Sequence, residues 1–407
     1  MIRLILFHDA EALRWSPFIE TRPVGEMLYG TSTLRARAER SLGTEARAYT
    51  GAQHLEGFDE PGSLPHLDPN AATDDDRIFL CVRAAINPPA APLPDRPATL
   101  YIGSQVVGWV VPAGEHGPGQ DARRDLRAGA GERIELQGEL LGRPWDLMAR
   151  NPARITADAG VDTSGNNAFQ LTDVPVLGNH RVILGGDATV EPGVILDARA
   201  GPVWLDRDTR VEGPARITGP LYLGAGSTIL GGSVRGSSIG PGCKVRGEVA
   251  ASVILGYCNK THDGYLGHSV LGRWVNLGAG TINSDLKNTY STVRVTLPTE
   301  EVDTGMVKVG GFLGDHVKTG IGTLINTGTV VGAGSNLFGG KMPPAYVPLF
   351  SWGEGENLVE YRLDRFLDIA QAVMNRRDVE LTEGMRELLG RAFEKSQIDR
   401  SNLKGRS

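Results

Sequence analysis

One segment of the sequence concentrates polar and titratable side chains that can do chemistry. Between Tyr257 and Thr281 lie His262, Tyr265 and Asn276. An imidazole titrates near neutral pH, so His262 can take a proton from an attacking nucleophile, although a lone histidine is more often an ordinary surface or core group. No cysteine or serine stands beside a base in this motif, which favours direct group transfer over a covalent enzyme intermediate.

A metal site is the alternative interpretation of the same region. His262, His268 and His316 supply three imidazoles, and three imidazoles with an open fourth position can bind zinc. Their spacing differs from that of the three-histidine zinc sites of γ-class carbonic anhydrases, and such a site leaves Tyr265 and Asn276 unexplained. We therefore expect no metal site here.

Other polar residues are candidates on weaker grounds. Lys287 and Lys318 can pair with the phosphate groups of a ligand because of their charge. Taken singly, each lysine is better explained as a solvated surface residue than as a functional one. Asn276 can likewise belong to a ladder of side chains within the fold.

A six-residue repeat predicts the scaffold that holds these side chains. Aliphatic residues, with one threonine, recur six apart in two series: Leu205, Val211, Ile217, Leu223 and Ile229, then Leu313, Thr319, Ile325, Val331 and Leu337. This period fits neither an α-helix nor a β-meander, and it is typical of a hexapeptide parallel β-helix. The aliphatic residue points into a triangular prism, and a small residue allows the turn at each corner. The 54 glycines, well above the usual share of about 7%, agree with this fold rather than with a flexible segment.

The pattern changes on both sides of this repeat. Towards the N-terminus, β and α signals alternate, which predicts an α/β domain with strands at 3–7 and 77–82 and a helix at 33–42. Beyond the repeat, apolar residues at helical spacing predict helices that can cap the open end of the prism. The expected organisation is an α/β domain at 1–155, a linker at 156–176, a left-handed β-helix at 177–340 with an inserted loop at 283–308, and a C-terminal helical segment at 341–407.

Composition restricts the class of partner. The net charge of −6 provides no basic surface for nucleic acid or anionic lipid. No apolar run approaches the ~18 residues that span a bilayer, and the first residues lack a signal-peptide pattern. Three cysteines do not form a disulfide framework. We expect a cytoplasmic protein that acts on small molecules, without nucleic acid and without membrane insertion.

The segment around His262 resembles the acetyltransferase half of a bifunctional family. His-x-x-Tyr-Leu-Gly (262–267) and Val-Asn-Leu-Gly-Ala-Gly-Thr-Ile (275–282) are similar to motifs of the UDP-N-acetylglucosamine pyrophosphorylase/glucosamine-1-phosphate N-acetyltransferases. Asn-Ser-Asp-Leu-Lys-Asn (283–288), Gly-Asp-His-x-Lys-x-Gly-Ile (314–321) and Phe-Ser-Trp-Gly (350–353) resemble bacterial and archaeal sugar nucleotidyltransferases. The resemblance covers roughly residues 220–340. It implies acetyl-CoA-dependent N-acetylation of an amino-sugar 1-phosphate by a homotrimer with sites between neighbours.

The resemblance also implies roles for individual residues. His262 lies where the family has its general base, Tyr265 where a tyrosine contacts the sugar phosphate, and Asn276 where an asparagine binds the sugar. Ala279 matches a position whose backbone faces acetyl-CoA, and Lys260 lies one place from a phosphate-binding lysine of the family. The further candidates are Lys287 for the sugar phosphate, and Asp315, His316 and Lys318 along the CoA-contacting edge.

The N-terminal region occupies the place of the family's nucleotidyltransferase domain but departs from its pattern. Thr-Arg-Pro-Val (21–24) resembles the opening of the sugar nucleotidyltransferases. No glycine-rich loop follows the strand at 3–7, however, and Arg83 follows the strand at 77–82, where an aspartate holds Mg²⁺ in the typical enzyme. Arg14, Arg22 and Arg83 can still hold nucleotide phosphates, and Mg²⁺ is expected only if this domain is active. We expect an abridged Rossmann-like domain that serves as a degenerate scaffold or a regulatory domain.

Three functions remain open at this point. The first is N-acetylation of an amino-sugar 1-phosphate. The second is nucleotidyl transfer from UTP or dTTP to a sugar 1-phosphate, with the β-helix as a trimerisation scaffold. The third is binding of a sugar nucleotide without turnover, as a sensor.

Overall fold

The chain folds into two compact units. The computed structural model describes residues 3–66, 75–129, 131–161, 166–167 and 173–401. One unit comprises most of residues 1–144 together with Thr382–Ala392, and the other comprises Leu28–Thr31, Trp145–Leu381 and the chain beyond residue 392. Each unit is described by itself.

A mixed six-stranded sheet forms the centre of the first unit. Its strand order is β4-β1-β5-β8-β7-β9, in which β4, β1 and β5 run parallel, β8 is antiparallel to both β5 and β7, and β9 is parallel to β7. The strands predicted at 3–7 and 77–82 are β1 and β5, and the helix predicted at 33–42 is α1. The bounds are β1 Arg3–Phe7, α1 Leu34–Leu42, β4 Ala46–Thr50, β5 Arg77–Cys81, β6 Ala84–Ile86, β7 Ala98–Ile102, β8 Gln105–Val111, α2 Gln120–Asp125, β9 Glu132–Glu135 and β10 Gly138–Leu140.

Local sequence explains the ends of α1. The Thr33 side chain accepts a hydrogen bond from the Ala36 amide at 3.1 Å, which caps the N-terminus of the helix. Gly43 ends it in the left-handed conformation at φ 64°, where an added Cβ would be strained. The helix boundaries are therefore set by a capping threonine and a glycine that the sequence displays.

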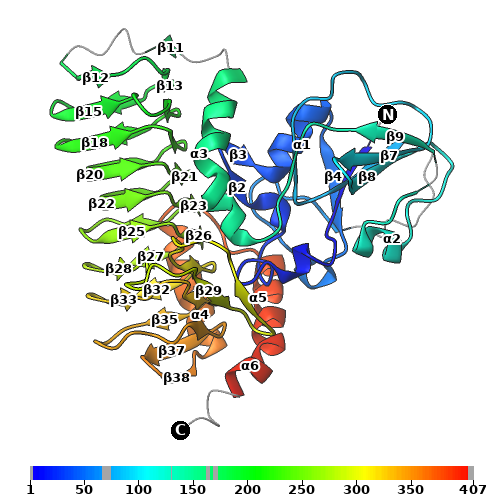
Figure 1. Cartoon of the computed structure of the whole chain (residues 1–407). Helices are drawn as coiled ribbons and strands as arrows, with labels where there is room; N and C mark the ends of the chain where they lie inside the picture. Colours follow the sequence, from blue (N-terminus) through cyan, green and yellow to red (C-terminus); the bar gives the residue numbers. More distant parts are fainter. Residues whose placement is uncertain (1–2, 67–74, 130, 162–165, 168–172, 402–407) are drawn as a thin grey trace. The chain divides into compact units, whose positions relative to one another are not determined.

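Parallel strands stack as successive coils in the second unit and form the predicted β-helix (Figure 1). One face is a ten-stranded sheet, here called the first face, with strands β11 Asn166–Asn167, β13 Val182–Leu184, β16 Val203–Leu205, β19 Leu221–Leu223, β21 Ser238–Ile239, β23 Val253–Gly256, β26 Val270–Arg273, β31 Phe312–Leu313, β34 Val330–Val331 and β36 Tyr346–Val347. The second face, as used below, holds the beginning of β22 (Lys244–Ala250) and then β24 Asn259–Lys260, β27 Asn276–Leu277, β32 Lys318–Thr319 and β35 Asn336–Leu337. The third face holds the end of β22 and then β25 Tyr265–Gly267, β28 Ile282–Asn283 and β33 Leu324–Ile325.

The remaining strands complete the earlier coils and both ends. They are β12 Val176–Leu177, β14 Thr189–Val190, β15 Val194–Asp197, β17 Arg210–Val211, β18 Ala215–Thr218, β20 Thr228–Arg235, β22 Lys244–Ala250, β37 Ser351–Glu354 and β38 Asn357–Glu360. Both predicted hexapeptide series point into the prism, since every member is at most 5% exposed. Burial of these stacked aliphatic side chains stabilises the coils, at roughly 1.5–3 kcal/mol for each fully buried Val, Leu or Ile.

Several segments differ from the predicted organisation. The expected linker at 156–176 begins inside α3 (Pro144–Val161), a continuous helix. The inserted loop at 283–308 contains an antiparallel hairpin of β29 (Arg294–Thr296) and β30 (Glu301–Asp303). The C-terminal segment is not helical from its start, because β36 and β37 continue the parallel coils and β38 then pairs antiparallel with β37, ending at Glu360. Its helices are α4 (Leu363–Asn375), α5 (Glu383–Lys395) and α6 (Gln397–Ser401).

One corner of the prism is built by aromatic residues rather than by glycine alone. Tyr257, Trp274, His316 and Phe350 occupy it in four coils with φ between 54° and 64°, a conformation that non-glycine residues seldom adopt. The Tyr257 and Trp274 rings stack at a centroid distance of 4.3 Å, and His316 continues the column at 6.2 Å from Trp274. Phe366 of α4 packs edge-on against His316 at 5.7 Å. This aromatic column therefore attaches α4 to the β-helix.

None of the helices in the described parts of the chain combines the length and apolarity that a bilayer crossing requires.

Candidate functional site

The corner between the second and third faces carries His262. Asn259 pairs with Asn276 in the next coil, and the Gly280 amide donates to the Asp263 carbonyl oxygen at 3.2 Å. His262 and Ala279 therefore occupy the same corner in successive coils. The His262 side chain is exposed, and within the described residues its imidazole has no hydrogen-bond or ion-pair partner. A ring nitrogen at this corner is free to take a proton from a bound molecule.

Asn276 and Ala279 flank this histidine. Asn276 is exposed on the second face, one residue before the buried Leu277, so its amide points outward and not into the prism. The Ala279 carbonyl oxygen accepts from the Gly322 amide at 2.7 Å, which fixes this turn against the next coil. The structure thus brings three of the predicted site residues to one corner and the strand beside it.

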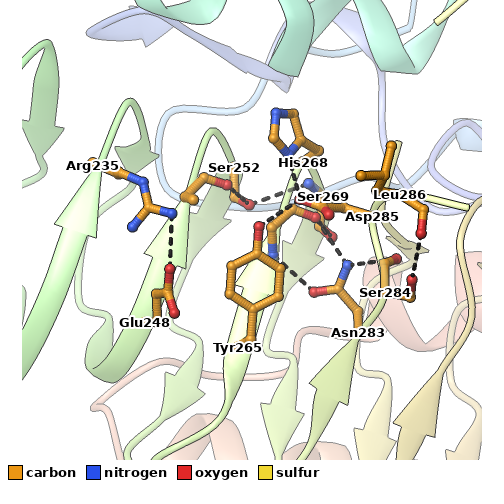
Figure 2. Close-up of polar contacts among 12 residues, drawn as sticks. Arg235, Glu248, Ser252, Tyr265, His268, Ser269, Asn283, Ser284, Asp285 and Leu286 are labelled. Atoms are coloured by element: carbon orange, nitrogen blue, oxygen red, sulfur yellow. Dashed lines mark hydrogen bonds and ion pairs between the residues drawn. The ribbon is translucent and has the colours of Figure 1, made fainter. Parts of the chain in front are cut away.

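Tyr265 lies on the third face and belongs to a polar cluster that the sequence analysis did not identify (Figure 2). Its hydroxyl donates to Asp285 Oδ2 at 2.5 Å, and His268 Nδ1 lies 2.6 Å from the same oxygen. Burial alone would raise the pKa of Asp285, but the hydrogen bonds from His268 and Tyr265 lower it below its usual value. Burial and this carboxylate raise the pKa of Tyr265 well above its usual range. The Tyr265 hydroxyl therefore keeps its proton and directs it to Asp285.

Asn283 holds the chain in the position that this cluster requires. Its Oδ1 accepts from the Gly267 amide at 2.8 Å, and its Nδ2 donates to the Gly267 carbonyl at 2.9 Å and to the Ser284 carbonyl at 3.1 Å (Figure 2). The side chain thereby joins β25 to the segment that carries Asp285. Asp285 and Asn283 both belong to the Asn-Ser-Asp-Leu-Lys-Asn motif at 283–288, and this motif is the feature of the sequence from which the cluster could have been predicted.

Lys260 does not face solvent as a phosphate contact would. It is in register with Val245, whose side chain points into the prism, and it is 3% exposed. Its Nζ donates to the Arg246 and His262 carbonyl oxygens at 2.7 and 3.0 Å, and burial lowers its pKa to about 8. Lys260 therefore holds the corner from inside, and we do not include it among the ligand contacts.

Asp315 and His316 are also internal. Each is 3% exposed, and Asp315 Oδ1 accepts from the Arg273 amide at 2.7 Å. His316 belongs to the aromatic column, so neither residue presents a polar group to a CoA molecule on the surface of this chain. Lys318 is half-buried on the second face, in register with Asn276. Lys287 lies in the inserted segment and donates to the Thr292 carbonyl at 2.9 Å.

The three histidines of the zinc alternative lie at separate places. His262 follows β24, His268 pairs with Asp285, and His316 packs between Trp274 and Phe366. In the parts of the chain that are described, His, Cys, Asp and Glu residues form no group of three or more that is suited to a metal ion.

The phosphate candidates of the first unit have other partners. Arg22 is 1% exposed and forms two hydrogen bonds with Glu60, at 2.7 and 2.6 Å. Arg83 is 4% exposed, and its Nε and Nη2 donate to the two carboxylate oxygens of Asp9 at 2.8 and 2.5 Å. Arg14 is exposed and pairs with Glu11 at 3.3 Å. Of the three, only Arg14 faces solvent.

These contacts do not fit a Mg²⁺ site in the first unit. Asp9 is the acidic residue beside the end of β5, and both of its oxygens are occupied by Arg83 while Oδ1 also accepts from the Ala12 amide at 3.0 Å. A guanidinium at this position opposes a divalent cation. His8 lies in the loop after β1, and both of its ring nitrogens are used in hydrogen bonds to the backbone. Its Nδ1 donates to the Thr50 carbonyl, and its Nε2 accepts from the Val24 amide. Burial lowers the pKa of His8 to about 3, so the ring is neutral.

Comparison with known proteins shows similarity to two kinds of transferase. Residues 4–167 match the sugar nucleotidyl transferase family. The chain is 33% identical over 211 residues to the bifunctional sugar-1-phosphate nucleotidylyltransferase/acetyltransferase of Sulfurisphaera tokodaii, a match that covers 51% of this chain and 47% of that relative. It is 27% identical over 204 residues to the bifunctional protein GlmU of Methanocaldococcus jannaschii, which covers 49% of this chain and 44% of that relative. The chain thus spans less than half the length of either relative. Residues 4–167 thus resemble the sugar nucleotidyl transferase family, and the chain is similar to bifunctional nucleotidylyltransferase/acetyltransferases over about half of its length.

Proposed function

We propose that the β-helix transfers the acetyl group of acetyl-CoA to the amine of an amino-sugar 1-phosphate. The observation that carries this proposal is the corner where His262 is exposed beside Ala279, with Asn276 on the adjoining strand. The similarity to bifunctional acetyltransferases supports it. The amine nitrogen attacks the thioester carbonyl, the new C–N bond forms as the C–S bond breaks, and His262 takes the proton that the amine loses. The departing CoA thiolate takes a proton from the His262 imidazolium, directly or through water, which returns the imidazole to its neutral form.

Direct transfer agrees with the surroundings of the cysteines. Cys243 and Cys258 are 0% and 2% exposed inside the prism, so neither is placed to form an acyl-enzyme on the surface. Most of the rate then comes from holding the two substrates in contact.

Within this proposal, Tyr265 and Asp285 recognise the polar groups of the sugar rather than its phosphate. The Tyr265 proton is committed to Asp285, and Asp285 carries a negative charge. A carboxylate and an acceptor oxygen suit hydroxyl or ammonium donors, whereas they repel a phosphate. This refines the phosphate-contacting role that the resemblance implied for Tyr265.

Tyr265→Phe is expected to raise the KM for glucosamine 1-phosphate about tenfold with a smaller change in kcat. The lost group is a hydrogen-bonding hydroxyl beside a charge, worth roughly 1.5 kcal/mol. Steady-state CoA release measures the effect, and Tyr290→Phe, at a side chain that is 72% exposed, is the control. Equal KM values for the two variants would remove Tyr265 from the sugar site.

A homotrimer is part of the proposal. Ile282 and Leu324 lie side by side on β28 and β33 and are 41% and 40% exposed, and Ile321 at the adjoining corner is 80% exposed. Exposed aliphatic side chains grouped on one face favour packing against another copy. Such packing would bring a neighbouring chain close to the His262 corner.

Nucleotidyl transfer by the first unit is the second candidate function, supported by the family match of residues 4–167. The Arg83–Asp9 pair argues against it, because it occupies the carboxylate that a metal would need. CoA release with glucosamine 1-phosphate and pyrophosphate release with UTP or dTTP, measured in parallel on the full chain, separate the two. We expect CoA release alone. Pyrophosphate release alone would reverse the assignment, and ligand binding without either product would identify a sensor.

A further inference from the structure

A cavity lies on the β-helix, at the side of the second face nearer the aromatic column. Its volume is about 570 Å³, within the range of small-molecule sites. Lys244, Asn276 and Lys318 line it from the second face, and Arg376 and Arg377 line it from the C-terminal end of α4. All of these residues belong to the second unit, so the cavity is complete within it.

The residues that line this cavity carry positive charge and no negative charge. Four of its lining residues are Lys or Arg, and none of its ten lining residues, all of them described, is Asp or Glu. Lys244 and Arg376 have no hydrogen-bond or ion-pair partner for their side chains among the described residues. Like charges gathered in one cavity repel each other, and a polyanion relieves this repulsion.

The positions of the cations are fixed by the fold. Lys244 pairs with Asn259, Asn259 with Asn276, and Asn276 with Lys318, so cations and amides form one ladder across four coils. Arg377 Nη1 donates to the Gly242 carbonyl and Nη2 to Asn259 Oδ1, both at 2.9 Å, which holds the end of α4 beside this ladder. Cationic and amide donors directed at one space match the acceptor oxygens of phosphate groups.

Helix stability alone does not account for this arrangement. Arg376 is the C-cap residue of α4, where a cation favours the helix dipole. That explanation does not apply to Lys244 and Lys318, which lie on strands. Burial lowers the pKa of Lys318 to about 8, and a bound anion would offset that cost.

We infer that this cavity binds a phosphorylated small molecule, with Lys244, Lys318 and Arg376 as its phosphate contacts and Arg377 as the residue that positions α4. Thr261 also lines the cavity and immediately precedes His262, so a ligand held here can extend to the proposed base. The phosphate group can come from CoA, from the sugar phosphate or from a separate nucleotide. The proposal goes beyond acetyl transfer, since it requires binding and not turnover.

Isothermal titration of the full chain with CoA, glucosamine 1-phosphate and UDP tests this inference. At least one of the three is expected to bind, and more weakly at higher salt. Lys244→Gln and Arg376→Gln should each weaken that binding about tenfold or more. Arg365→Gln, which removes an exposed cation from the same helix, should change it less than twofold. Circular dichroism verifies that each variant is folded.

The probe that binds shows which kind of phosphorylated molecule the cavity accepts. CoA would mark the cavity as the anionic end of the acetyl-donor site, glucosamine 1-phosphate as the acceptor site, and UDP as a site for a nucleotide effector. If the wild type and His262→Ala both bound a probe but the wild type released no CoA from acetyl-CoA, the cavity proposal would stand and the proposed acetyl transfer would be overturned. Absence of binding for all three probes, or equal affinity in Lys244→Gln, Arg376→Gln and wild type, would overturn the cavity proposal itself.

Discussion

Replacing His262 with alanine is expected to slow CoA release in the presence of glucosamine 1-phosphate by about 10²- to 10⁴-fold, the usual contribution of a general base. The His262 imidazole is exposed at a corner of the prism. The backbone of the same residue is held in place because the buried Lys260 ammonium donates a hydrogen bond to the His262 carbonyl oxygen. Removing the side chain therefore leaves the coil intact while removing the proton acceptor. The effect should fall on kcat, since the imidazole acts during the transfer and not in substrate binding.

A matched control is available on the same β-helix. His180 is also exposed, in the turn before β13, and lies far from the His262 coil in the stack of strands. His180→Ala should retain wild-type turnover, and sedimentation should give the same assembly for both variants. If His262→Ala retained turnover within twofold of wild type, His262 would not be the base.

Replacing Arg83 with methionine is expected to lower the free energy of unfolding by about 3–5 kcal/mol. The variant leaves the Asp9 carboxylate, 2% exposed, without the two hydrogen bonds that now compensate for its burial. Urea unfolding monitored by circular dichroism measures the change. The double variant Asp9→Asn/Arg83→Met should recover part of the loss, because the uncompensated charge is then removed.

Arg96→Met provides the comparison for a surface pair. Arg96 contacts Glu132 with the side chains 67% and 43% exposed, so its loss should cost at most about 1 kcal/mol. Similar losses for Arg83→Met and Arg96→Met would show that the buried pair is not a structural element of the first unit. A large loss of unfolding free energy in Arg83→Met alone would support a scaffold role for Arg83.

The repeat made the architecture of the β-helix predictable, because each inward aliphatic side chain repeats its neighbour's environment. Leu205, Val211 and Leu223 are buried as their six-residue spacing requires. The inward position of Lys260 was not predictable in this way. Equivalent inward positions lie 16 residues apart from Ile229 to Val245 and 15 residues apart from Val245 to Lys260. These coils are shorter than three complete hexapeptides, so the six-residue pattern no longer indicates which side chains point inward near the site.

The candidate site was predicted in part. The motif around His262 predicted that His262, Tyr265 and Asn276 surround one cleft. The strand register brings His262 to one corner with Ala279, beside Asn276, and Tyr265 lies on the third face. Asp285 and His268 were missed because their contact joins different coils, which the sequence separates by 17 residues. Arg376 and Arg377 were missed for a similar reason, since a helical pattern does not show which strands the end of the helix meets. The aromatic corner was unexpected because left-handed turns are usually assigned to glycine.

Transfer of labelled acetyl from acetyl-CoA to glucosamine 1-phosphate by the wild-type chain is the most direct test of the central claim. The account predicts one N-acetylated sugar phosphate, detected by mass spectrometry, for each CoA released. CoA release without labelled product, or no release with any hexosamine 1-phosphate, would contradict it.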